Sequence, residues 1–600
     1  MVHLSENTKR LKVKHVAIRS RDALLEETHN LTDVCLLRLP SCAPTEYGHR
    51  LQGISQLAAD VAANLGPETT LITLGEVIDL VQIHASVASS LRYQHWIAIK
   101  RSSQRTIKES FTLPQYHFGA LIHTGYKSSL QHAKTRIRYT YCPVCDKTTK
   151  DYGGKKHTYH EYGTLMSDVW RDIACDLDGD LTPIINRFAD LFGIEHYQEI
   201  RVLDLRPLGL KRIPVEPVKH ALSKSQESNE LFRTSTNKLI LGDCLERLRE
   251  IPDESVDFVF ADPPYNLGKK YVNYTDNLEI TDFFKWCDEW IIELARVLRS
   301  GRTCAILNIP LWAIRHFLQM EKILNFQSWI VWDALSFPVR FIMPAHYTIL
   351  CFSKGKPREL PGLTGEAGRT EVSNVTDTFK SLSPLAEGFC LRSLCVKTRR
   401  KMQVDDRGPL TDLWGDIHRL KHNTRRVDHP CQLPPQLMYR LISLFTKPDE
   451  IVLDCFNGSG TTTLAAHQIG RRYIGIEISE EYHNLAQARH EEILKGLDPF
   501  RKTYRLLTAK NSPVSRMPKR KYEISKKKLQ LEIKRIAENL RRLPTRDEVV
   551  RYSKYPIKYY DEYFSSWGEV CAAARTTGMT EAHVKEEDKF KAKQLTLEIY

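Results

Sequence analysis

The sequence predicts an α/β fold in which a sheet of alternating strands and helices is preceded by a degenerate copy of itself and followed by a small helical domain. Three observations support this. Strand-type and helix-type segments alternate between residues 238 and 495, the landmarks of that region recur upstream in the same order, and basic residues accumulate after it. Alternating β and α segments are typical of a parallel sheet. A chain of 600 residues is also too long for one core, so several domains are expected.

The expected domain boundaries follow from the repeat and from changes in composition. The degenerate copy covers residues 1–209 and the intact copy residues 236–498; we call them the first copy and the second copy. Residues 210–235 contain Lys, Pro, Ser and Gln and few apolar side chains, so they are predicted to be a linker. Residues 499–600 are predicted to form a basic helical tail.

The internal repeat is recognised by pairs of similar segments that occur in the same order. Residues 31–202 can be laid over residues 255–452. The offset drifts from roughly 220 to 250 residues, as expected of duplicated domains rather than short repeats. One such pair could arise by chance, but an ordered series is hardly a coincidence. The paired segments are Tyr47–Gly48 with Tyr265–Asn266, Leu71–Gly75 with Cys304–Asn308, His95–Ala98 with Ser328–Val331, Leu113–Lys127 with Met343–Lys356, Ser167–Ile173 with Thr411–Ile417, and Val202–Asp204 with Val452–Asp454.

The second copy opens with the strand-type segment Lys238–Asp243, which ends in an acid and is followed by a helix expected from about Cys244. A second strand, Val256–Ala261, leads directly into Asp262-Pro263-Pro264-Tyr265. That places a carboxylate, two rigid prolines and an aromatic ring at the carboxyl end of a strand, where open α/β sheets bind ligands. The alternative is a proline-stiffened turn without chemistry.

A glycine-rich turn marks the other end of the second copy. The strand-type segment Ile451–Asp454 runs into Phe456-Asn457-Gly458-Ser459-Gly460, a helix is expected over 461–469, and the strand Arg472–Glu477 ends in an acid. The glycines allow a ligand to approach the backbone, and a carboxylate in the position of Glu477 can accept hydrogen bonds from both hydroxyls of a ribose. No Gly-Lys-Ser/Thr follows, so a nucleoside with a neutral or positive substituent fits better than a nucleotide phosphate. The alternative is a turn that only packs a strand on a helix.

The first copy departs from the second at both of these places. Pro44-Thr45-Glu46 lies opposite Asp262-Pro263-Pro264, and Arg206-Pro207-Leu208 stands where the glycine turn is expected. The first copy therefore keeps scaffold-like residues and lacks the predicted site.

Together, the Asp262–Tyr265 motif and the Phe456–Gly460 turn resemble those of the DNA amino-methyltransferases that modify adenine N6 or cytosine N4. The order of the motifs resembles the permuted β class, in which a target-recognition segment lies between them. The resemblance covers 238 to about 495 and implies a Rossmann-like methyltransferase sheet, S-adenosylmethionine as cofactor, and a target base flipped out of the duplex. It also implies catalytic roles for Asp262, Pro263, Pro264 and Tyr265, in which Asp262 and the Pro263 carbonyl accept the amine hydrogens and Tyr265 stacks on the base.

The same resemblance implies a set of cofactor-binding residues. The glycine turn would lie along the methionine end of the cofactor, Glu477 would hold its ribose, and Asp243 is placed near its adenine. The full set is Asp243, Asp454, Phe456, Gly458, Gly460, Thr461, Thr462 and Glu477.

An Asp in the first motif position resembles the adenine-N6 enzymes, whereas cytosine-N4 enzymes more often have Ser there. We therefore expect a site-specific DNA adenine-N6 methyltransferase, with cytosine N4 as the alternative. Another methylated substrate, such as RNA or a protein glutamine, and a catalytically silent DNA-binding regulatory protein are further alternatives. The sequence leaves the recognition sequence, and a cognate restriction enzyme, open.

The net charge of +14 favours a polyanionic partner, and double-stranded DNA is the partner we expect. Basic residues concentrate in 512–542, and Leu543-Pro544-Thr545 begins another helix with Thr545 as its cap. With Tyr559-Tyr560, Tyr563–Trp567 and Ala572–Gly578, this tail resembles the DNA-binding repeat attached to homing endonucleases. An ordinary basic helical appendage is the alternative.

The cysteines indicate either reduced thiols or metal ligands, because fourteen of them are scattered through a chain without an export signal. Cys142 and Cys145, followed by His157 and His160, have the ligand types and spacing of a structural zinc site. Cys390 and Cys395 lie in a comparable place in the second copy, so a site shared between the copies is an alternative, and so are thiols without metal.

No apolar run approaches the roughly 18 residues of a membrane span, so a cytoplasmic protein without a membrane partner is expected. Finally, we hypothesise that the first copy replaces a second subunit, which would make the chain an internal pseudo-dimer.

Overall fold

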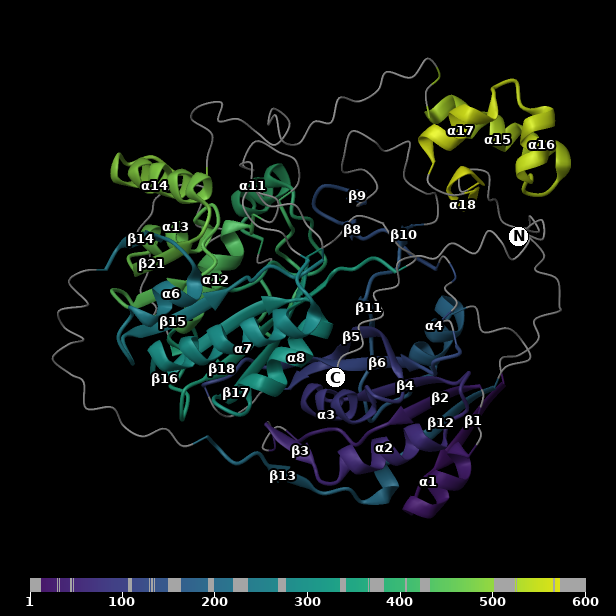
Figure 1. Ribbon diagram of the computed structural model, residues 1–600, viewed down its shortest axis with the longest axis horizontal. Coiled ribbons are helices and arrows are strands. Elements are labelled where there is room, and N and C mark those ends of the chain that lie inside the picture. Colours follow the sequence, from purple (N-terminus) through teal and green to yellow (C-terminus); the bar gives the residue numbers. More distant parts are fainter. Residues whose placement is uncertain are drawn as a thin grey trace. The chain divides into compact units, whose positions relative to one another are not determined.

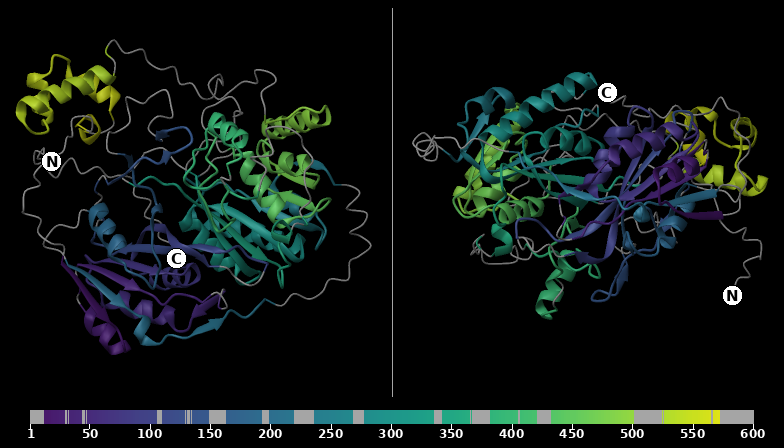
Figure 2. Two further views of the ribbon diagram at one scale, coloured as in Figure 1. Left: turned by 180° about the vertical axis from the view of Figure 1, so that it is seen from behind. Right: turned by 90° about the horizontal axis from the view of Figure 1, so that it is seen from below.

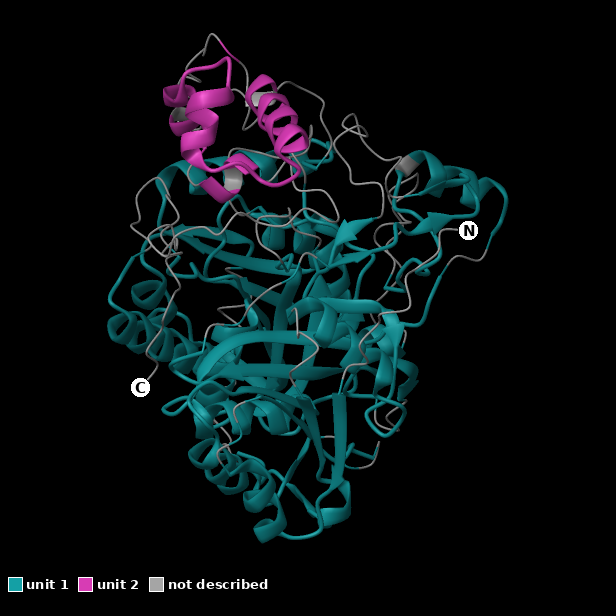
Figure 3. Ribbon diagram, turned by 90° about the vertical axis from the view of Figure 1, so that its right-hand side faces the viewer, with its two compact units in different colours: residues 1–510, 599–600 teal, residues 511–598 magenta. Residues whose placement is uncertain are grey.

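The computed structural model describes most of residues 12–571. The residues not described are 1–11, 30, 32, 44–45, 47, 106–109, 129, 131–132, 134, 149–162, 193–198, 219–235, 268–276, 335–341, 365, 367–381, 405–406, 421–431, 501–523, 525, 565–566 and 572–600. The chain divides into two compact units, residues 1–510 with 599–600, and residues 511–598 (Figure 3). Both copies belong to the first unit. Among the described helices, none combines the length and the apolar character that a membrane crossing requires.

The second copy is built on a mixed sheet in the order β14-β21-β20-β15-β16-β18-β17-β19 (Figure 1). Its strands are β14 (Lys238–Leu241), β15 (Val256–Ala261), β16 (Leu298–Asn308), β17 (Asn325–Asp333), β18 (His346–Ser353), β19 (Leu413–Trp414), β20 (Ile451–Asp454) and β21 (Arg472–Glu477). Its helices are α6 (Cys244–Arg249), α7 (Ile280–Val297), α8 (Pro310–Met320), α9 (Pro361–Thr364), α11 (Ser393–Lys401), α12 (Pro435–Phe445), α13 (Thr461–Gln468) and α14 (Glu480–Leu494).

The central strands of this sheet are parallel because helices connect them across its faces. Strand β15 is buried along its whole length, as expected of a strand covered on both sides. Helix α7 buries Trp290, Ile291 and Leu294 on one side. It has an acidic residue, Asp282, in its first turn and a basic residue, Arg296, in its last turn. The parallel arrangement expected from the alternating segments ends at β18, which runs antiparallel to β16 and β17.

The first copy has a second mixed sheet, in the order β1-β12-β2-β4-β6-β5-β11. Its strands are β1 (Lys12–Ala17), β2 (Val34–Arg38), β4 (Thr70–Gly75), β5 (Arg92–Arg105), β6 (Gln115–Thr124), β11 (Val169–Ala174) and β12 (Glu199–Asp204). Helices α1 (Arg21–Thr28), α2 (Ile54–Asn64), α3 (Val77–Val87) and α4 (Thr182–Phe192) accompany them. In both views of Figure 2 the purple and blue strands of this sheet form a group separate from the teal and green strands of the other.

The two sheets share their strand order except at one position. Five of the six segment pairs recognised in the sequence fall on corresponding strands, such as β4 with β16, β5 with β17, and β12 with β20. In the sixth pair, Gly48 and Tyr265–Asn266 lie outside the strands, and Tyr47 is outside the described residues. In the second copy β21 lies between β14 and β20, whereas in the first copy β1 pairs directly with β12. After β12 the described chain forms the short 3-10 helix Arg206–Leu208 and then β13 (Arg212–Pro214). The first copy therefore lacks, in its described part, the strand that carries Glu477 in the second.

Strand β13 lies inside the segment expected to be a linker. It pairs antiparallel with β3 (His49–Leu51), and the buried Arg212 donates a hydrogen bond of 2.8 Å to Asp79. The beginning of that segment is therefore ordered by an ion pair and by backbone hydrogen bonds that its polar composition did not reveal.

The two copies pack against each other through corresponding elements. The paired residues Trp96 and Trp329 stack with ring centroids 4.9 Å apart. The backbone amides of Ala345 and His346 donate to Asp168, and the amide of Tyr116, from the matching segment of the first copy, donates to Asp412. Such exchange of equivalent contacts is the property of a twofold interface between identical subunits.

The second unit contains four described helices around a small core. These are α15 (Lys526–Leu540), α16 (Arg546–Tyr552), α17 (Ile557–Tyr563) and α18 (Trp567–Cys571). Leu529, Ile533 and Ile536 of α15 pack with Tyr560 in this core. Thr545 caps α16 in a capping box with Glu548, which confirms the predicted start of that helix. The segment 572–578 of the proposed repeat lies outside the described residues.

Candidate functional site

The two motifs that are far apart in the sequence meet at one edge of the second sheet. Strand β15 lies between β20 and β16, and Phe260 is directly opposite Asp454. Strands β15 and β20 run parallel to each other, so the residues that follow them leave the sheet at the same edge. Asp262 therefore lies next to the start of the glycine-rich turn.

The catalytic-type loop is held by hydrogen bonds at both ends of its tyrosine. The Tyr265 hydroxyl donates to Asp262 Oδ1 at 2.9 Å, and the Trp312 indole donates to the Tyr265 carbonyl at 2.8 Å. The Tyr265 side chain is mostly buried, and Asp262 is partly exposed. Prolines at positions 263 and 264 fix φ along the loop, which stiffens the backbone that follows the carboxylate.

Two glycines, one in the turn and one on the neighbouring strand β21, leave no room for a side chain where they pack. Gly460 has φ of 84°, in the left-handed region that favours glycine, and a Cβ there would lie 2.9 Å from Ala486 Cβ. A Cβ on Gly475 of β21 would lie 2.7 Å from Asn457 Cγ. Asn457 in turn accepts a hydrogen bond from Thr463. The turn is thus shaped by close contact with the next strand and with α14.

Glu477 closes the site from the end of β21. Its two carboxylate oxygens accept hydrogen bonds from the amides of Gly458, at 2.7 Å, and Ser479, at 2.8 Å. Burial raises the pKa of Glu477, and these amides act in the opposite direction. The carboxylate therefore stands beside the glycine turn, as the sequence predicts for a residue that contacts a ribose.

Asp454 is a third carboxylate in the same place. Burial raises its pKa to about 7, the hydrogen bonds from Thr462 and the Phe456 amide oppose this rise, and the nearby charges of Asp262 and Glu477 add to it. Three carboxyl groups gathered in a partly buried site repel one another when ionised, so a positively charged ligand would stabilise all three.

The remaining predicted cofactor residues have visible structural roles. Asp243 is the N-cap of α6 and accepts from the amides of Leu245 and Glu246. Thr461 and Thr462 form the buried first turn of α13, and the Thr462 hydroxyl also lies 3.2 Å from Met438 Sδ of α12. Asp243 is therefore explained by capping alone, although it follows β14, which pairs directly with β21.

Several aromatic residues near the site were not singled out from the sequence. Trp286 and Trp290 of α7 lie against Phe456, with ring centroids 5.7 and 5.4 Å away. On the other side, the ring centroids of Tyr347, in β18, and Tyr265 are 6.4 Å apart. The Arg419 guanidinium lies over the Tyr347 ring, 4.3 Å from its centroid. The spacing of Trp286 and Trp290 on one helix face could have indicated a shared role. No motif marks Tyr347.

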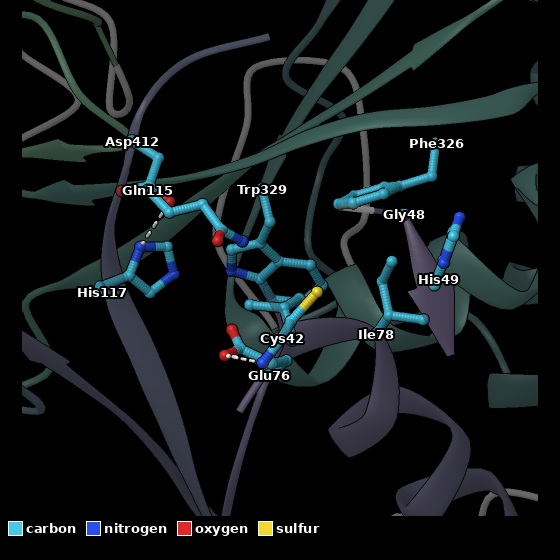
Figure 4. A pocket seen from close by; sticks show the side chains of 11 residues that line it. Cys42, Gly48, His49, Glu76, Ile78, Gln115, His117, Phe326, Trp329 and Asp412 are labelled. Atoms are coloured by element: carbon cyan, nitrogen blue, oxygen red, sulfur yellow. Dashed lines mark hydrogen bonds and ion pairs between the residues drawn. The ribbon is translucent and has the colours of Figure 1, made fainter. Parts of the chain in front are cut away.

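The described part of the corresponding region in the first copy contains a small cavity. A cavity of about 20 Å³ lies near the end of β2, lined by Cys42, Glu76, His117 and residues of the second copy (Figure 4). That is room for little more than one water molecule. Glu76 forms an ion pair of 2.7 Å with the buried Arg101. Burial alone would raise the pKa of Glu76, but Arg101 and Arg105 lower it below its ordinary value.

Four cysteines from the two copies come together in a second cluster. The Sγ atoms of Cys142, Cys145, Cys390 and Cys395 all lie within 4.8 Å of one another. His157 and His160, the other ligands predicted for the first copy, lie outside the described residues. This set of thiols could hold a zinc ion.

Comparison with known families places residues 256–488 within a family model described as DNA methylase, for N6 and N4 methylation. Among curated proteins, the type II methyltransferase M.BamHI of Bacillus amyloliquefaciens is 34% identical, over 42% of this chain and 57% of its own length. The DNA adenine methyltransferase YhdJ of Escherichia coli is 31% identical, over 43% of this chain and 84% of its own length. This chain thus spans little more than half of the first relative.

A solved structure with a matching region is that of the PvuII DNA methyltransferase, described as cytosine-N4-specific. It is 20% identical, the match covers 44% of this chain and 96% of that one, and the TM-score is 0.30.

Proposed function

We propose that this chain, which belongs to the family of N6 and N4 DNA methylases, transfers a methyl group from S-adenosylmethionine to the exocyclic N6 amine of adenine in double-stranded DNA. The observation that carries the proposal is the meeting of Asp262 and the glycine turn at neighbouring strand ends, with Glu477 beside them.

The charge of the site supports this cofactor. S-adenosylmethionine supplies an electrophilic methyl group on a positively charged sulfur. Asp262, Asp454 and Glu477 offer negative charge close to the place where that cation would lie. The turn at Gly458 and Gly460 admits the cofactor's amino-acid end, Glu477 accepts hydrogen bonds from the ribose, and Phe456 with Trp286 and Trp290 forms an apolar wall. Asp243 follows β14, which pairs with β21, and besides capping α6 it is the acid that we assign to the adenine of the cofactor.

The chemistry needs positioning more than a strong base, because the lone pair of the exocyclic amine is delocalised into the ring. Asp262 and the Pro263 carbonyl accept the two amine hydrogens, which localises the lone pair and aligns it with the methyl group. The Tyr265 hydroxyl holds Asp262 Oδ1 before the base arrives, so the carboxylate is already oriented. The rings of Tyr265 and Tyr347 offer surfaces on which a flipped base can stack.

Adenine is favoured by the aspartate at position 262 and by YhdJ, whose name specifies adenine. DNA as the substrate is supported by the family and by the positive charge of the chain, +14. The first copy, which lacks both sequence motifs of the site, takes the place of a second subunit; the equivalent contacts through Trp96 and Trp329 support this role. The basic second unit adds contacts to phosphates.

The proposal is tested by incubating the purified chain with labelled S-adenosylmethionine and unmethylated genomic DNA, then separating the nucleosides of the digested product. We expect label in N6-methyldeoxyadenosine. Label in N4-methyldeoxycytidine would show that the target is cytosine and not adenine. Label in RNA or protein, with none in DNA, would refute DNA as the substrate. The matched control for an Asp262→Ala variant is Glu46→Ala, because Glu46 lies in the corresponding loop of the first copy and should not affect transfer.

A further inference from the structure

The cluster of Cys142, Cys145, Cys390 and Cys395 is built from both copies. Cys142 and Cys145 lie in the hairpin of β8 (Tyr141–Cys142) and β9 (Lys147–Thr148), and Cys390 and Cys395 lie just before and within α11. The Sγ atoms of Cys142 and Cys395 are 3.7 Å apart, and so are those of Cys145 and Cys390. These distances far exceed the roughly 2.05 Å of a disulfide bond, so none of the four cysteines forms a disulfide.

The spacing of the sulfur atoms matches a tetrahedral metal site. Four thiolates bound to zinc at about 2.3 Å lie roughly 3.8 Å from one another. Here two pairs are at 3.7 Å and none of the four sulfurs is more than 4.8 Å from another. Cys142, Cys390 and Cys395 are buried, and Val144 and Phe389 pack around them, so the sulfurs lie in an apolar, protected place.

Arg399 supplies half of the compensating charge that such a site requires. Four thiolates and one Zn²⁺ carry a net charge of −2, which is costly to bury without a compensating cation. The fully buried Arg399 donates to Cys395 Sγ at 3.2 Å and to the Cys390 carbonyl at 2.9 Å, and its guanidinium lies over the Phe389 ring. Hydrogen bonds of this kind orient the ligands of structural zinc sites.

The two cysteine pairs occupy corresponding places in the two copies. Along the chain, Cys142 and Cys145 come between β6 and β11, and Cys390 and Cys395 come between β18 and β19. Strands β18 and β19 correspond to β6 and β11 in the strand order of the two sheets. Each copy therefore contributes half of the ligands, as subunits do at a metal site shared across a twofold interface.

We propose that Cys142, Cys145, Cys390 and Cys395 bind one structural Zn²⁺ that fastens the two copies together. The ion also fixes the start of α11, whose residues Lys397, Arg400 and Lys401 are basic, within the segment between the two motifs of the methylase site. The zinc has no open coordination position, so it takes no part in chemistry. A salt bridge between Lys100 of β5 and Glu387, which precedes Cys390 in the chain, also joins the two copies.

The test is the metal content of the full chain, purified without chelators and measured by inductively coupled plasma mass spectrometry. We expect about one zinc per chain, and with Co²⁺ in its place the absorption of a tetrahedral site with four thiolate ligands. A chain that contains no metal, even after zinc is added during expression, or that contains iron instead, would overturn the proposal.

Variants decide whether the site is shared. Cys390→Ser with Cys395→Ser should lower the zinc content at least tenfold, whereas His157→Ala with His160→Ala should leave it unchanged. The control is Cys175→Ser, because the Cys175 thiol donates to the Asp180 carbonyl and serine can replace that hydrogen bond. Zinc retained in the double serine variant, or lost in the double alanine variant, would assign the ligands to the first copy alone and refute a shared site.

Discussion

At the scale of single residues, the site is defined by carboxylates whose surroundings differ. Asp262 is partly exposed and held by a tyrosine hydroxyl, Glu477 is held by two backbone amides, and Asp454 is fully enclosed. The sequence predicts all three because each follows an apolar strand. It does not predict their mutual distances, since these depend on β15 and β20 being neighbours in the sheet.

Glu477→Gln should weaken the binding of S-adenosylmethionine without unfolding the chain. The amide keeps the shape of the side chain but removes a charged acceptor, and a hydrogen bond to a charged group contributes about 1.5–3 kcal/mol, or roughly a 10- to 100-fold change in Kd. Isothermal titration calorimetry measures this change. The matched control is Glu480→Gln, an exposed acid at the start of α14, and equal affinities in the two variants would contradict the role of Glu477.

Asp454 should make the stability of the cofactor-free chain fall as the pH rises. The pKa of Asp454 is about 7 in the folded chain and about 3.9 in the unfolded chain. Its contribution to the free energy of unfolding is therefore fully present below pH 4 and is lost as the pH rises through 7. The effect is on the order of 1 kcal/mol per pH unit between these values. Asp454→Asn should therefore show a thermal midpoint that falls less between pH 5 and pH 7 than that of the wild type. Parallel pH profiles would contradict the raised pKa.

At the scale of elements, the glycine turn and the strand after it act as one structure. Gly475 of β21 leaves room for Asn457, which is part of the turn. Adding a methyl group there would push the turn away from the strand. The position of Asn457 thus depends on a glycine that the motif itself does not contain.

Gly475→Ala should lower the affinity for S-adenosylmethionine at least tenfold while most of the thermal stability remains, because the clash is local. Calorimetric titration and thermal unfolding are the measurements. Gly388→Ala is the control, since a Cβ at Gly388 would meet nothing within 4 Å. An affinity equal to that of the control would show that the turn tolerates the displacement.

The elements also show where prediction from sequence succeeds and where it ends. Apolar runs that end in an acid or a glycine turn place β15, β20 and β21 correctly, because the signal is local. The antiparallel direction of β18 and the contact of Trp96 with Trp329 depend on segments distant in sequence. The cysteines lie between these cases. The sequence offers a local site with His157 and His160 and, as an alternative, a site shared with Cys390 and Cys395, and only the fold brings these two to Cys142 and Cys145.

At the scale of the whole molecule, the second copy carries the candidate site and the first copy keeps the scaffold alone. The equivalent contacts of Asp168 and Asp412 with the opposite copy describe an interface that a symmetric dimer would form twice. Duplication within one chain allows one half to lose its site while the interface is kept. The domain boundaries at residues 209 and 235 stay a prediction.

Removing residues 511–600 should weaken binding to a DNA duplex and make it less sensitive to salt. The second unit and the residues around it are rich in Lys and Arg, and each phosphate neutralised contributes about −0.9 to the slope of log K against log salt concentration. Fluorescence anisotropy at several salt concentrations should give a shallower slope for the truncated chain, with unchanged affinity for S-adenosylmethionine. An unchanged slope would show that this unit does not contact the DNA backbone.

The most direct test of the whole account is the sequencing of DNA from cells that express the chain, with modified bases identified at single-nucleotide resolution. We expect N6-methyladenine at one recurring sequence in cells with the wild type or Glu46→Ala, and its loss in cells with Asp262→Ala. Methylation that persists in the Asp262→Ala cells, or no new modified base with the wild type, would contradict it.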